Sequence, residues 1–519
     1  MKKTGYICLL LYLLHGLSLH AQGGLRPRGD VNCDWEVTIA DVNALTDSVL
    51  GGARYHSLYN YAADLNGDRE ITIADLNMLV DALLGSELPP MPTYSGTLPV
   101  LYINTKGHRN IDSKEVYVNA SWWLNAMGIE GYQSIGSANE PLEMQIKGLG
   151  NYSWTNSDKK TFRLKLNEKH PMLGMSASRH WVLLANAFSW RGQIENTLPY
   201  EIGRRMGMAW NPHMKPVEVV LNGQYIGLYF LTEKIRVAKN RVNIEEQSDG
   251  ETEMELVTGG WLLEIDNYNE PGNITFTEGN GKPFWVQPHS PEELSDVQYD
   301  YISAFLIAAD TAIYCSDKSS TEWEQYIDID SLALYYVVQE IVDNPEAFSG
   351  SCYMYKHRGE DTKLIFGPIW DCDHSYDNCN DDCQPRFIYD SVPSNWYVRW
   401  IAEIAKFPRF QDRVRHYWKL FYENVYPGID SYLDDFSVML QGVWRNNYER
   451  WPQYNGNNDM PYRLEHYGRR AFHKKVGWLQ SQWGEETPSS ELHKKTWVQG
   501  NEVKFLEDMR VKTGILQQF

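Results

Sequence analysis

Apolar and polar residues alternate along much of the front half of the chain, from about residue 98 to residue 234. A period of two puts alternate side chains on opposite faces of an extended segment, so this pattern predicts strands with one buried face. The Asn-Gly pair at 222–223 predicts a tight hairpin between the last two strands. We expect strands at 98–105, 114–121, 142–148, 161–167, 180–186, 217–223 and 225–234.

The pattern changes after about residue 290, where apolar residues recur at helical spacing. A strand-rich front followed by a helix-rich back predicts an α+β body over 97–485, and residues 486–519 are expected to form a tail. We expect helices at 194–207, 293–312 and 330–343, strands at 351–357 and 362–371, and mostly helices from 395 to 482.

The first 21 residues have the pattern of a secretory signal. Lys2 and Lys3 precede an apolar run at 7–19, and the small residue Ala21 follows it. Such a segment is cleaved during export and is too short for a comfortable membrane span. No later segment approaches the roughly 18 apolar residues of a membrane helix. We therefore expect a secreted bacterial protein, extracellular or periplasmic, that loses residues 1–21 and has no integral membrane span.

The net charge and the cysteines limit which partners and which metal sites the protein is expected to have. The formal charge of −20 argues against a nucleic-acid or anionic-membrane partner, because phosphate contacts require clustered Lys and Arg. Cys379 and Cys383, with Cys372 nearby, allow a zinc site, a local disulfide or free thiols. Without a second closely spaced cysteine pair, we favour the disulfide or the free thiols over zinc.

Two matched acidic loops lie between residues 29 and 86. Each begins Asp-x-Asn-x-Asp, closes with Asp at loop position 12, and leads into an apolar helical pattern, at 42–50 and at 76–84. Oxygen ligands at positions 1, 3, 5 and 12 suit calcium, which takes roughly six to eight hard oxygens. Two copies favour calcium over a merely solvated acidic loop. The predicted ligands are Asp30, Asn32, Asp34 and Asp41 for one ion, and Asp64, Asn66, Asp68 and Asp75 for the other.

This duplicated unit resembles type I dockerin modules, which fold on calcium and plug an extracellular protein into a cohesin partner. The resemblance covers residues 29–86 and implies a small all-α domain of calcium loops and helices, with a cohesin-like partner. In that family loop positions 10 and 11 help choose the partner, and both copies here have Ile-Ala, at 39–40 and 73–74. The Pro-rich segment 87–96 predicts a stiff linker to the body.

Six segments of the body stand out, at 146–154, 159–167, 217–235, 259–267, 343–356 and 364–373. In this order they resemble the CotH kinase family, which is named for a spore-coat protein and built on a diverged protein-kinase fold. No Walker-type P-loop and no HRD or DFG triplet is present, as is typical of that family. The resemblance implies a two-lobed, kinase-like body that transfers phosphate from a nucleotide to a protein hydroxyl.

Asp371 and Asp373 are the predicted magnesium ligands. Two carboxylates one residue apart at a strand end suit Mg²⁺, which prefers a couple of carboxylates plus phosphate oxygens and water. The alternative is a buried Trp370 beside a solvated acidic turn. The resemblance favours the metal site and implies that Trp370 stacks on adenine, with ATP and Mg²⁺ as the cofactors of an active enzyme.

The resemblance also implies a phosphate-binding lysine on the basic strand at 161–167 or just before it. Lys160 and Lys165 should lie on opposite faces, so only one can enter a cleft, and we prefer Lys160. Arg163 is a further candidate for cofactor binding, and a solvated strand face is the alternative. Glu233 and Glu264 are carboxylates on predicted strands that face the same cleft, where ion-pair or surface roles explain them equally well.

Glu346 is the predicted general base, and here the chain departs from the family. The family pattern is Asn-x-Asp, whereas this chain has Asn344-Pro345-Glu346. An error of about 1 Å in positioning can cost on the order of a hundredfold in rate. A catalytically impaired pseudokinase or binding module is therefore the alternative to an active enzyme. Four more departures each alter a residue expected near the phosphates, at Leu149, Ser189, Glu195 and His374.

A glycan-directed role is the third hypothesis. Dockerin-like modules often accompany carbohydrate-active enzymes, and the 19 Trp and 33 Tyr residues offer faces that stack on sugars. A retaining glycosidase needs two carboxyl groups roughly 5 Å apart, and no pair in the sequence stands out for that role. Sugar binding in an assembly for polysaccharide breakdown stays open, while glycosidase catalysis ranks lowest.

Overall fold

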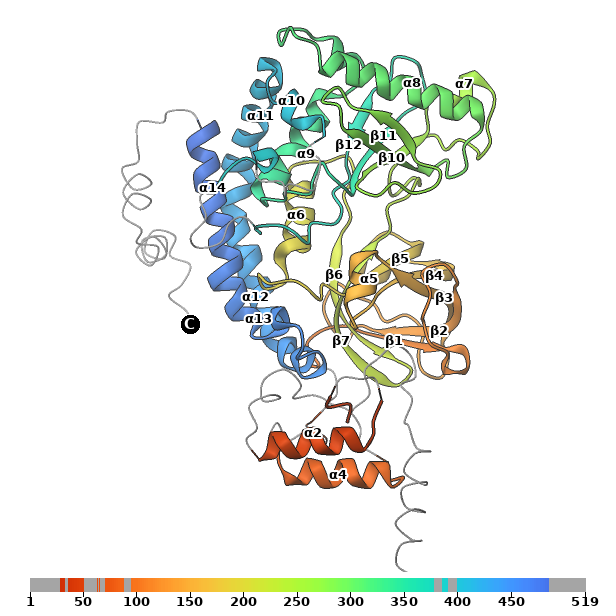
Figure 1. Cartoon of the computed structure of the whole chain (residues 1–519), viewed down its shortest axis with the longest axis vertical. Coiled ribbons are helices and arrows are strands. Elements are labelled where there is room, and N and C mark those ends of the chain that lie inside the picture. The colour runs from red at the N-terminus through yellow and green to blue at the C-terminus, as the bar shows by residue number, and fades with distance from the viewer. Residues whose placement is uncertain are drawn as a thin grey trace, which may run out of the picture.

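The computed structural model describes residues 29–32, 36–50, 63, 65, 71–87, 95–377, 385–390 and 399–484. Seven strands close into a barrel, five more form a separate sheet, and long helices run beside both (Figure 1). Two helices of a small N-terminal unit, α2 (Ile39–Val49) and α4 (Ile73–Leu83), pack against each other. Among the helices described, none is both long and apolar enough to cross a membrane.

The alternating pattern of the front half builds the barrel. Its strands are ordered β1-β2-β3-β4-β5-β7-β6, and the parallel pair β1–β6 closes the ring. Large side chains such as Trp122, Leu164 and Trp181 fill the interior, as expected for a small barrel. The strands are β1 (Val100–Thr105), β2 (Val118–Asn125), β3 (Leu142–Leu149), β4 (Thr161–His170), β5 (Ser178–Leu184), β6 (Met214–Leu221) and β7 (Gln224–Glu233).

The second sheet lies within the helix-rich half and has the order β12-β11-β8-β10-β9, with every neighbouring pair antiparallel. All five residues of β11 are buried. One face packs against the helices, and the other packs against residues 235–242, which follow β7. Its strands are β8 (Trp261–Asp266), β9 (Ile274–Thr277), β10 (Pro283–Ser290), β11 (Cys352–Lys356) and β12 (Leu364–Phe366).

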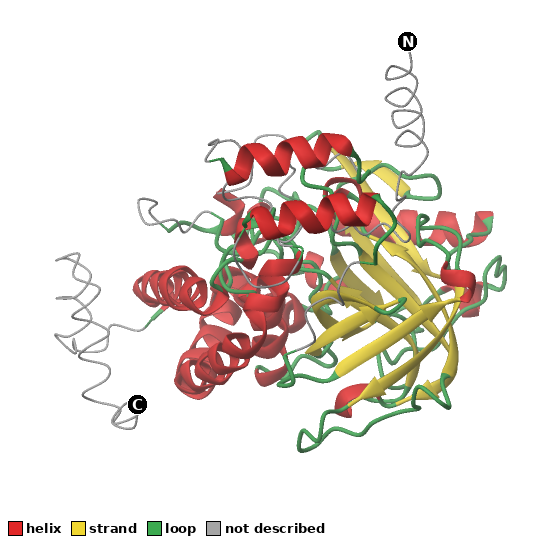
Figure 2. Cartoon of the chain, turned by 90° about the horizontal axis from the view of Figure 1, so that it is seen from below, coloured by secondary structure: helices red, strands yellow, loops and turns green. Residues whose placement is uncertain are grey.

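Helices supply the largest hydrophobic core and gather on one side of the strands (Figure 2). Residues 332–341 of α9 are all buried, so this helix forms the centre of the back half. Helix α12 packs on the barrel, where Asn447 Oδ1 accepts a 3.0 Å hydrogen bond from the backbone N–H of Leu228. The main helices are α6 (Ile194–Arg205), α8 (Asp296–Ile313), α9 (Ile329–Ile341), α11 (Pro408–Leu420), α12 (Ile429–Arg450) and α14 (Arg470–Trp483).

The closed barrel corrects the predicted fold class. The α+β class holds, but the two-lobed, kinase-like arrangement was wrong: the front half closes on itself, and a separate five-stranded sheet lies within the back half. Closure depends on the pairing of 100–103 with 218–221, which local alternation does not encode. The N-terminal unit, predicted to be all-α, is only partly helical in the residues described.

Glu278, between β9 and β10, is a buried carboxylate that should make stability depend on pH. Its Oε1 accepts a 2.8 Å hydrogen bond from the Tyr314 hydroxyl, and burial raises its pKa from 4.5 to about 7. Because the folded-state pKa is the higher one, the contribution to stability is full below about pH 4.5 and is lost as the pH rises through 7.

We expect this group to lower the free energy of unfolding by on the order of 1–3 kcal/mol between pH 5 and pH 8. Glu278→Gln keeps the acceptor for Tyr314 and should remove that decrease in urea denaturation at the two pH values. Glu322→Gln, at an exposed position, is the control. An unchanged pH dependence in Glu278→Gln would contradict the assignment.

Candidate active site

The Trp-Asp-x-Asp turn follows β12 and is held by helix α6. Asp371 has a left-handed backbone conformation (φ 54°), which non-glycine residues seldom adopt and which often marks functional sites. The Asn196 side chain clamps the turn, because its Nδ2 donates to Asp373 Oδ1 and its Oδ1 accepts from the Cys372 backbone N–H at 2.8 Å. No sequence pattern pointed to Asn196, which reaches this turn only through the packing of α6.

Glu346 lies opposite this turn, just after α9. Asn267 Nδ2 donates to its Oε1 at 2.9 Å, and Asn344 Oδ1 accepts from its backbone N–H at 3.2 Å. Burial raises the pKa of Glu346, and the negative charge of Asp371 raises it further. Glu346 and Asp371 therefore lie close enough to interact, and Asn267 fixes the direction of the glutamate.

His374 contributes a positive charge that the sequence analysis missed. Its Nδ1 lies 2.8 Å from Asp377 Oδ2, and this hydrogen bond raises the pKa of His374 to about 9, so the ring is protonated at neutral pH. Its Nε2 lies 3.9 Å from Glu346 Oε2. Arg191 supports the arrangement, with its guanidinium 3.3 Å from Asp377 and donating to the Tyr376 carbonyl at 2.6 Å.

The name acidic recess is used here for Asp371, Asp373, Glu346 and Glu264. The side chains of Asp371 and Asp373 are open to solvent. Surrounding protein nevertheless desolvates them and raises the pKa of both, and the charge of Glu264 adds to the effect on Asp371. The two carboxylates also repel each other, since the charge of Asp371 is one cause of the raised pKa of Asp373. Their mutual repulsion favours a bound cation.

The magnesium site predicted at Asp371 and Asp373 stays a prediction, and the residues present can be compared with what this ion requires. No three His, Cys, Asp or Glu side chains in the described part of the chain are close enough to hold a metal by themselves. Mg²⁺ commonly takes only one or two carboxylates and completes its shell with phosphate oxygens and water. Asp371 and Asp373 provide that incomplete set of hard oxygen ligands.

A cleft of about 620 Å³ lies between the outer face of the barrel and the end of β10. The name basic cleft is used for its cationic and imidazole side chains, which are Arg163, His180, Lys234, Arg236 and His289. Burial and the nearby charge of Arg163 lower the pKa of Lys234 to about 8. Three carboxylates, those of Glu246, Asp249 and Glu292, also line the cleft. None of the cations Arg163, Lys234 and Arg236 forms an ion pair with a described residue. Such cations favour an anionic ligand.

Glu264 connects the basic cleft to the acidic recess. Its Oε2 lies 2.5 Å from His289 Nε2 in the cleft, and its charge raises the pKa of Asp371 in the recess. Trp370 packs on the apolar cluster that contains Ile235 and Val237, two further residues of the cleft wall. The two sites are therefore neighbours, with Trp370 beside both.

The predicted lysines point elsewhere. Lys160 Nζ donates to the Trp154 carbonyl at 2.5 Å and lies over the Trp154 ring, and Lys165 is exposed beside Tyr117. Neither lines the basic cleft. Arg163, which shares their strand, is the residue that does.

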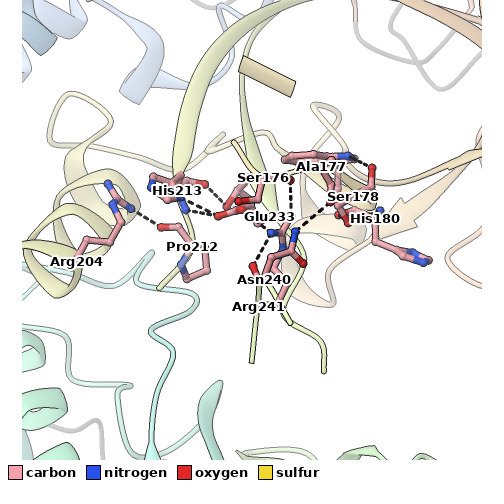
Figure 3. A network of polar contacts seen from close by, with 12 residues as sticks. Ser176, Ala177, Ser178, His180, Arg204, Pro212, His213, Glu233, Asn240 and Arg241 are labelled. Atoms are coloured by element: carbon pink, nitrogen blue, oxygen red, sulfur yellow. Dashed lines mark hydrogen bonds and ion pairs between the residues drawn. The ribbon is translucent and has the colours of Figure 1, made fainter. Parts of the chain in front are cut away.

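Glu233, the other predicted cofactor contact, is enclosed in a network of its own (Figure 3). Its Oε1 lies 2.8 Å from the Arg241 guanidinium, and both side chains are buried. Its Oε2 accepts from the backbone N–H of His213 at 3.0 Å. Arg241 also donates to the carbonyl oxygens of Asn240 and Ser176. The network ties the segment after β7 to the barrel.

Two of the departures from the family pattern contact each other. Ser189 Oγ donates to Glu195 Oε2 at 2.5 Å, and Glu195 Oε1 accepts from the backbone N–H groups of Trp190 and Arg191 at 2.7 and 2.8 Å. A carboxylate in the first turn of a helix is favourable. The pair shapes the loop that presents Arg191 to Asp377.

The closing aspartates of the two predicted calcium loops have equivalent surroundings. Asp41 and Asp75 are fully buried, and each accepts from the N–H of the helix-capping threonine, Thr38 at 2.8 Å or Thr72 at 2.9 Å. Each also accepts from an amide of the loop start, at 3.0 and 2.8 Å. Asp30 and Asn32 are described as well, whereas Asp34, Asp64, Asn66 and Asp68 lie outside the described residues.

The cysteine prediction is tested only in part, because Cys379 and Cys383 lie outside the described residues. Among the cysteines described, Cys315, Cys352 and Cys372 are free thiols.

The chain is thus an α+β protein with a closed barrel, a cluster of carboxylates whose charge favours a cation, and a cleft whose cations favour an anion. The sequence pattern of CotH kinase protein matches residues 145–483, more than half of the chain, and the chain belongs to this family. Strands β1 and β2, which complete the barrel, precede the matched segment. A search of curated proteins found no match.

The pattern of the dockerin type I domain matches residues 28–84, so both predicted families are confirmed. Dockerin type I domains generally bind calcium, dock onto cohesins and are typically extracellular. The exposed Ile39 and Ile73 begin α2 and α4, at the loop positions expected to influence partner choice.

Proposed function

We propose that this chain is a secreted phosphotransferase that moves a phosphoryl group from ATP to a protein hydroxyl, with Mg²⁺ as cofactor. The dockerin module, holding two calcium ions, would tether it to a cohesin. The observation that carries the proposal is the contact between the acidic recess and the basic cleft through Glu264. Phosphoryl transfer needs mainly positioning, a metal and cations on the phosphates, and a carboxylate near the acceptor.

Each requirement has a candidate residue. Asp371 and Asp373 would hold Mg²⁺, which would supply positive charge to offset that of the phosphates. Arg163 and Lys234 would bind the donor's phosphates from the barrel side, and Trp370 lies beside the cleft for the base.

Glu346 would accept the proton of the acceptor hydroxyl. Asn267 holds its Oε1, and burial raises its pKa, which makes it a stronger base than a solvated glutamate. Protonated His374, 3.9 Å away, would offset charge that develops at the transferred group.

A binding module without turnover is the second candidate. It is supported by the positions of Lys160 and Lys165 outside the cleft and by Leu149, the last residue of β3, which stands where the family has an arginine. A rise in melting temperature with ATP and Mg²⁺, but no phosphorylated product, would favour this candidate.

The experiment is label transfer from [γ-³²P]ATP with Mg²⁺, using the full chain with itself and dephosphorylated casein as acceptors, together with calorimetric binding of the analogue AMP-PNP. Hydrogen bonds to charged groups contribute about 1.5–3 kcal/mol each. Arg163→Met and Lys234→Met should therefore each weaken AMP-PNP binding about tenfold or more.

Lys160→Met and Lys165→Met are matched controls from the same basic segment and should leave the affinity unchanged. The reverse result, with the two lysine variants impaired and Arg163→Met and Lys234→Met normal, would contradict the placement of the phosphates. Equal labelling with and without Mg²⁺ would contradict the phosphotransferase itself.

A further inference from the structure

A second large cavity, of about 750 Å³, is lined by residues of α8, of the segment 321–326 and of the turn between β11 and β12, together with Arg409 of α11. Helix α8 lies at the top of Figure 1. The cavity shares no lining residue with the basic cleft or the acidic recess. One wall is aromatic and consists of Tyr301, Phe305 and Tyr326. The rim is polar and includes Glu324, Glu360, Asp361, Lys363 and Arg409.

The aromatic wall is held rigidly. The Tyr301 hydroxyl donates to the Thr258 carbonyl at 3.1 Å, and its ring stacks on buried Trp261 with centroids 6.5 Å apart. Phe305 lies next to Tyr301 and meets Tyr326 edge to face at 5.4 Å. Rings fixed in this way offer flat apolar surfaces at little cost in side-chain entropy.

The ammonium of Lys356 makes a cationic ligand unfavourable on these rings. Its ammonium is fully buried and is held by the carbonyl oxygens of Thr258 and Gly359 and by the Thr362 hydroxyl, at 2.5–2.7 Å. It lies 5.3 Å from the centroid of Phe305 and 5.9 Å from that of Tyr301. The cation–π attraction of both rings is therefore already used within the protein, and a second cation would be repelled.

The charges of the rim residues make an anionic ligand unfavourable as well. Arg409 is bound by Glu324 through two hydrogen bonds, of 2.7 and 3.0 Å, so its charge is neutralised. Lys363 is the remaining cation of the rim, and it is outnumbered by Glu360 and Asp361, which form no ion pair with a described residue. The net negative charge of these groups would repel a phosphate or a nucleic acid. Carboxylates accept hydrogen bonds from hydroxyl groups, and these two are available for that.

We propose that this cavity binds a neutral oligosaccharide, with sugar rings against Phe305 and Tyr326 and sugar hydroxyls donating to Glu360 and Asp361. A chain of pyranose units has apolar C–H faces for the aromatic wall and hydroxyls for the rim, and it carries no charge. Sites for small ligands commonly combine such an apolar wall with a few placed polar groups. This inference is independent of the phosphotransferase proposal, because the two sites share no residue.

The test is isothermal titration calorimetry of the full chain with cellohexaose, xylohexaose, mannohexaose and hexalysine. At least one hexasaccharide should bind, and Tyr326→Ala and Asp361→Asn should each raise its dissociation constant about tenfold or more. Tyr299→Ala is the control, because Tyr299 is a part-exposed tyrosine on α8, the helix that carries Tyr301 and Phe305, but lies outside the cavity. It should bind the sugar normally.

Three results would overturn the inference: no binding of any of the three sugars, equal sugar affinity in the Tyr326 and Asp361 variants, or hexalysine binding that Tyr326→Ala abolishes. ATP labelling measured in Tyr326→Ala separates the two proposals, since it should match the wild type whether or not sugar binding is lost.

Discussion

Replacing Lys475 by methionine is expected to lower the free energy of unfolding by about 3–5 kcal/mol. The Lys475 ammonium on α14 lies 3.0 Å from Glu340 and 2.6 Å from Asp343, and it donates to the Arg386 carbonyl at 2.6 Å. The two carboxylate side chains are at most 1% exposed and that of Lys475 is fully buried. Methionine fills a similar volume but leaves two buried carboxylates without their cation.

Urea denaturation of the full chain, followed by tryptophan fluorescence, measures this loss. Lys406→Met is the matched control, because its ammonium also lies 2.5 Å from a carboxylate, that of Glu403, but it is 59% exposed. An exposed pair contributes about 1 kcal/mol or less. Adding Asp343→Asn to Lys475→Met should recover part of the loss. A Lys475→Met variant as stable as the Lys406 control would show that the buried triad of Lys475, Glu340 and Asp343 does not stabilise the fold.

The triad also bears on the site. Asp343 immediately precedes Asn344, and its backbone carbonyl accepts from the Tyr376 N–H at 3.1 Å. Lys475 therefore anchors the point where the segment leading to Glu346 meets the turn that follows Asp373. We expect partly folded preparations of the variant to lose nucleotide binding together with stability.

Asp371→Asn should reduce label transfer from ATP by about a thousandfold, since a metal that bridges phosphates supplies several kcal/mol of charge stabilisation. Asparagine is among the residues that tolerate a positive φ, so it suits the 54° of this position. It also removes one member of a group of repelling carboxylates. The melting temperature should therefore stay the same or rise, which separates a lost function from a lost fold.

Asp373→Asn should behave in the same way in label transfer, although it alters the hydrogen bond from Asn196. Asp412→Asn, at an exposed position on α11, is the control and should transfer label normally. Transfer by Asp371→Asn at the wild-type rate, with Mg²⁺ present, would rule out the metal-binding role of this carboxylate.

The seven barrel strands were predictable because alternation is a local signal. The predicted strand at 114–121 begins too early, and the reason is a turn in which the Ser113 hydroxyl accepts from the N–H groups of Glu115 and Val116, both at 3.0 Å. Strands β9 and β10 were missed, and β10 contains two prolines that argue against a strand. Closure of the barrel rests on a pairing between distant segments and could not be predicted from alternation.

The candidate site also contains residues that local sequence patterns indicate and residues that only the fold brings into place. Asp371, Asp373 and Glu346 were predicted from a short motif and a resemblance, and the structure places them near one another, while their roles stay predictions. Asn196 and Asn267 were not found, because a lone asparagine becomes informative only when folding places it beside a carboxylate. Alternation put Lys160 and Lys165 on opposite faces but could not show which residue of the strand borders a cleft. That depends on where the end of β10 and the segment after β7 lie relative to β4.

A crystal structure of the chain with AMP-PNP and Mn²⁺, whose anomalous signal locates the metal, would test the proposed nucleotide site directly. We expect the metal at the carboxylates of Asp371 and Asp373, with phosphate oxygens within hydrogen-bond distance of Arg163 or Lys234. A nucleotide bound elsewhere, or a metal that contacts neither aspartate, would contradict the proposed site.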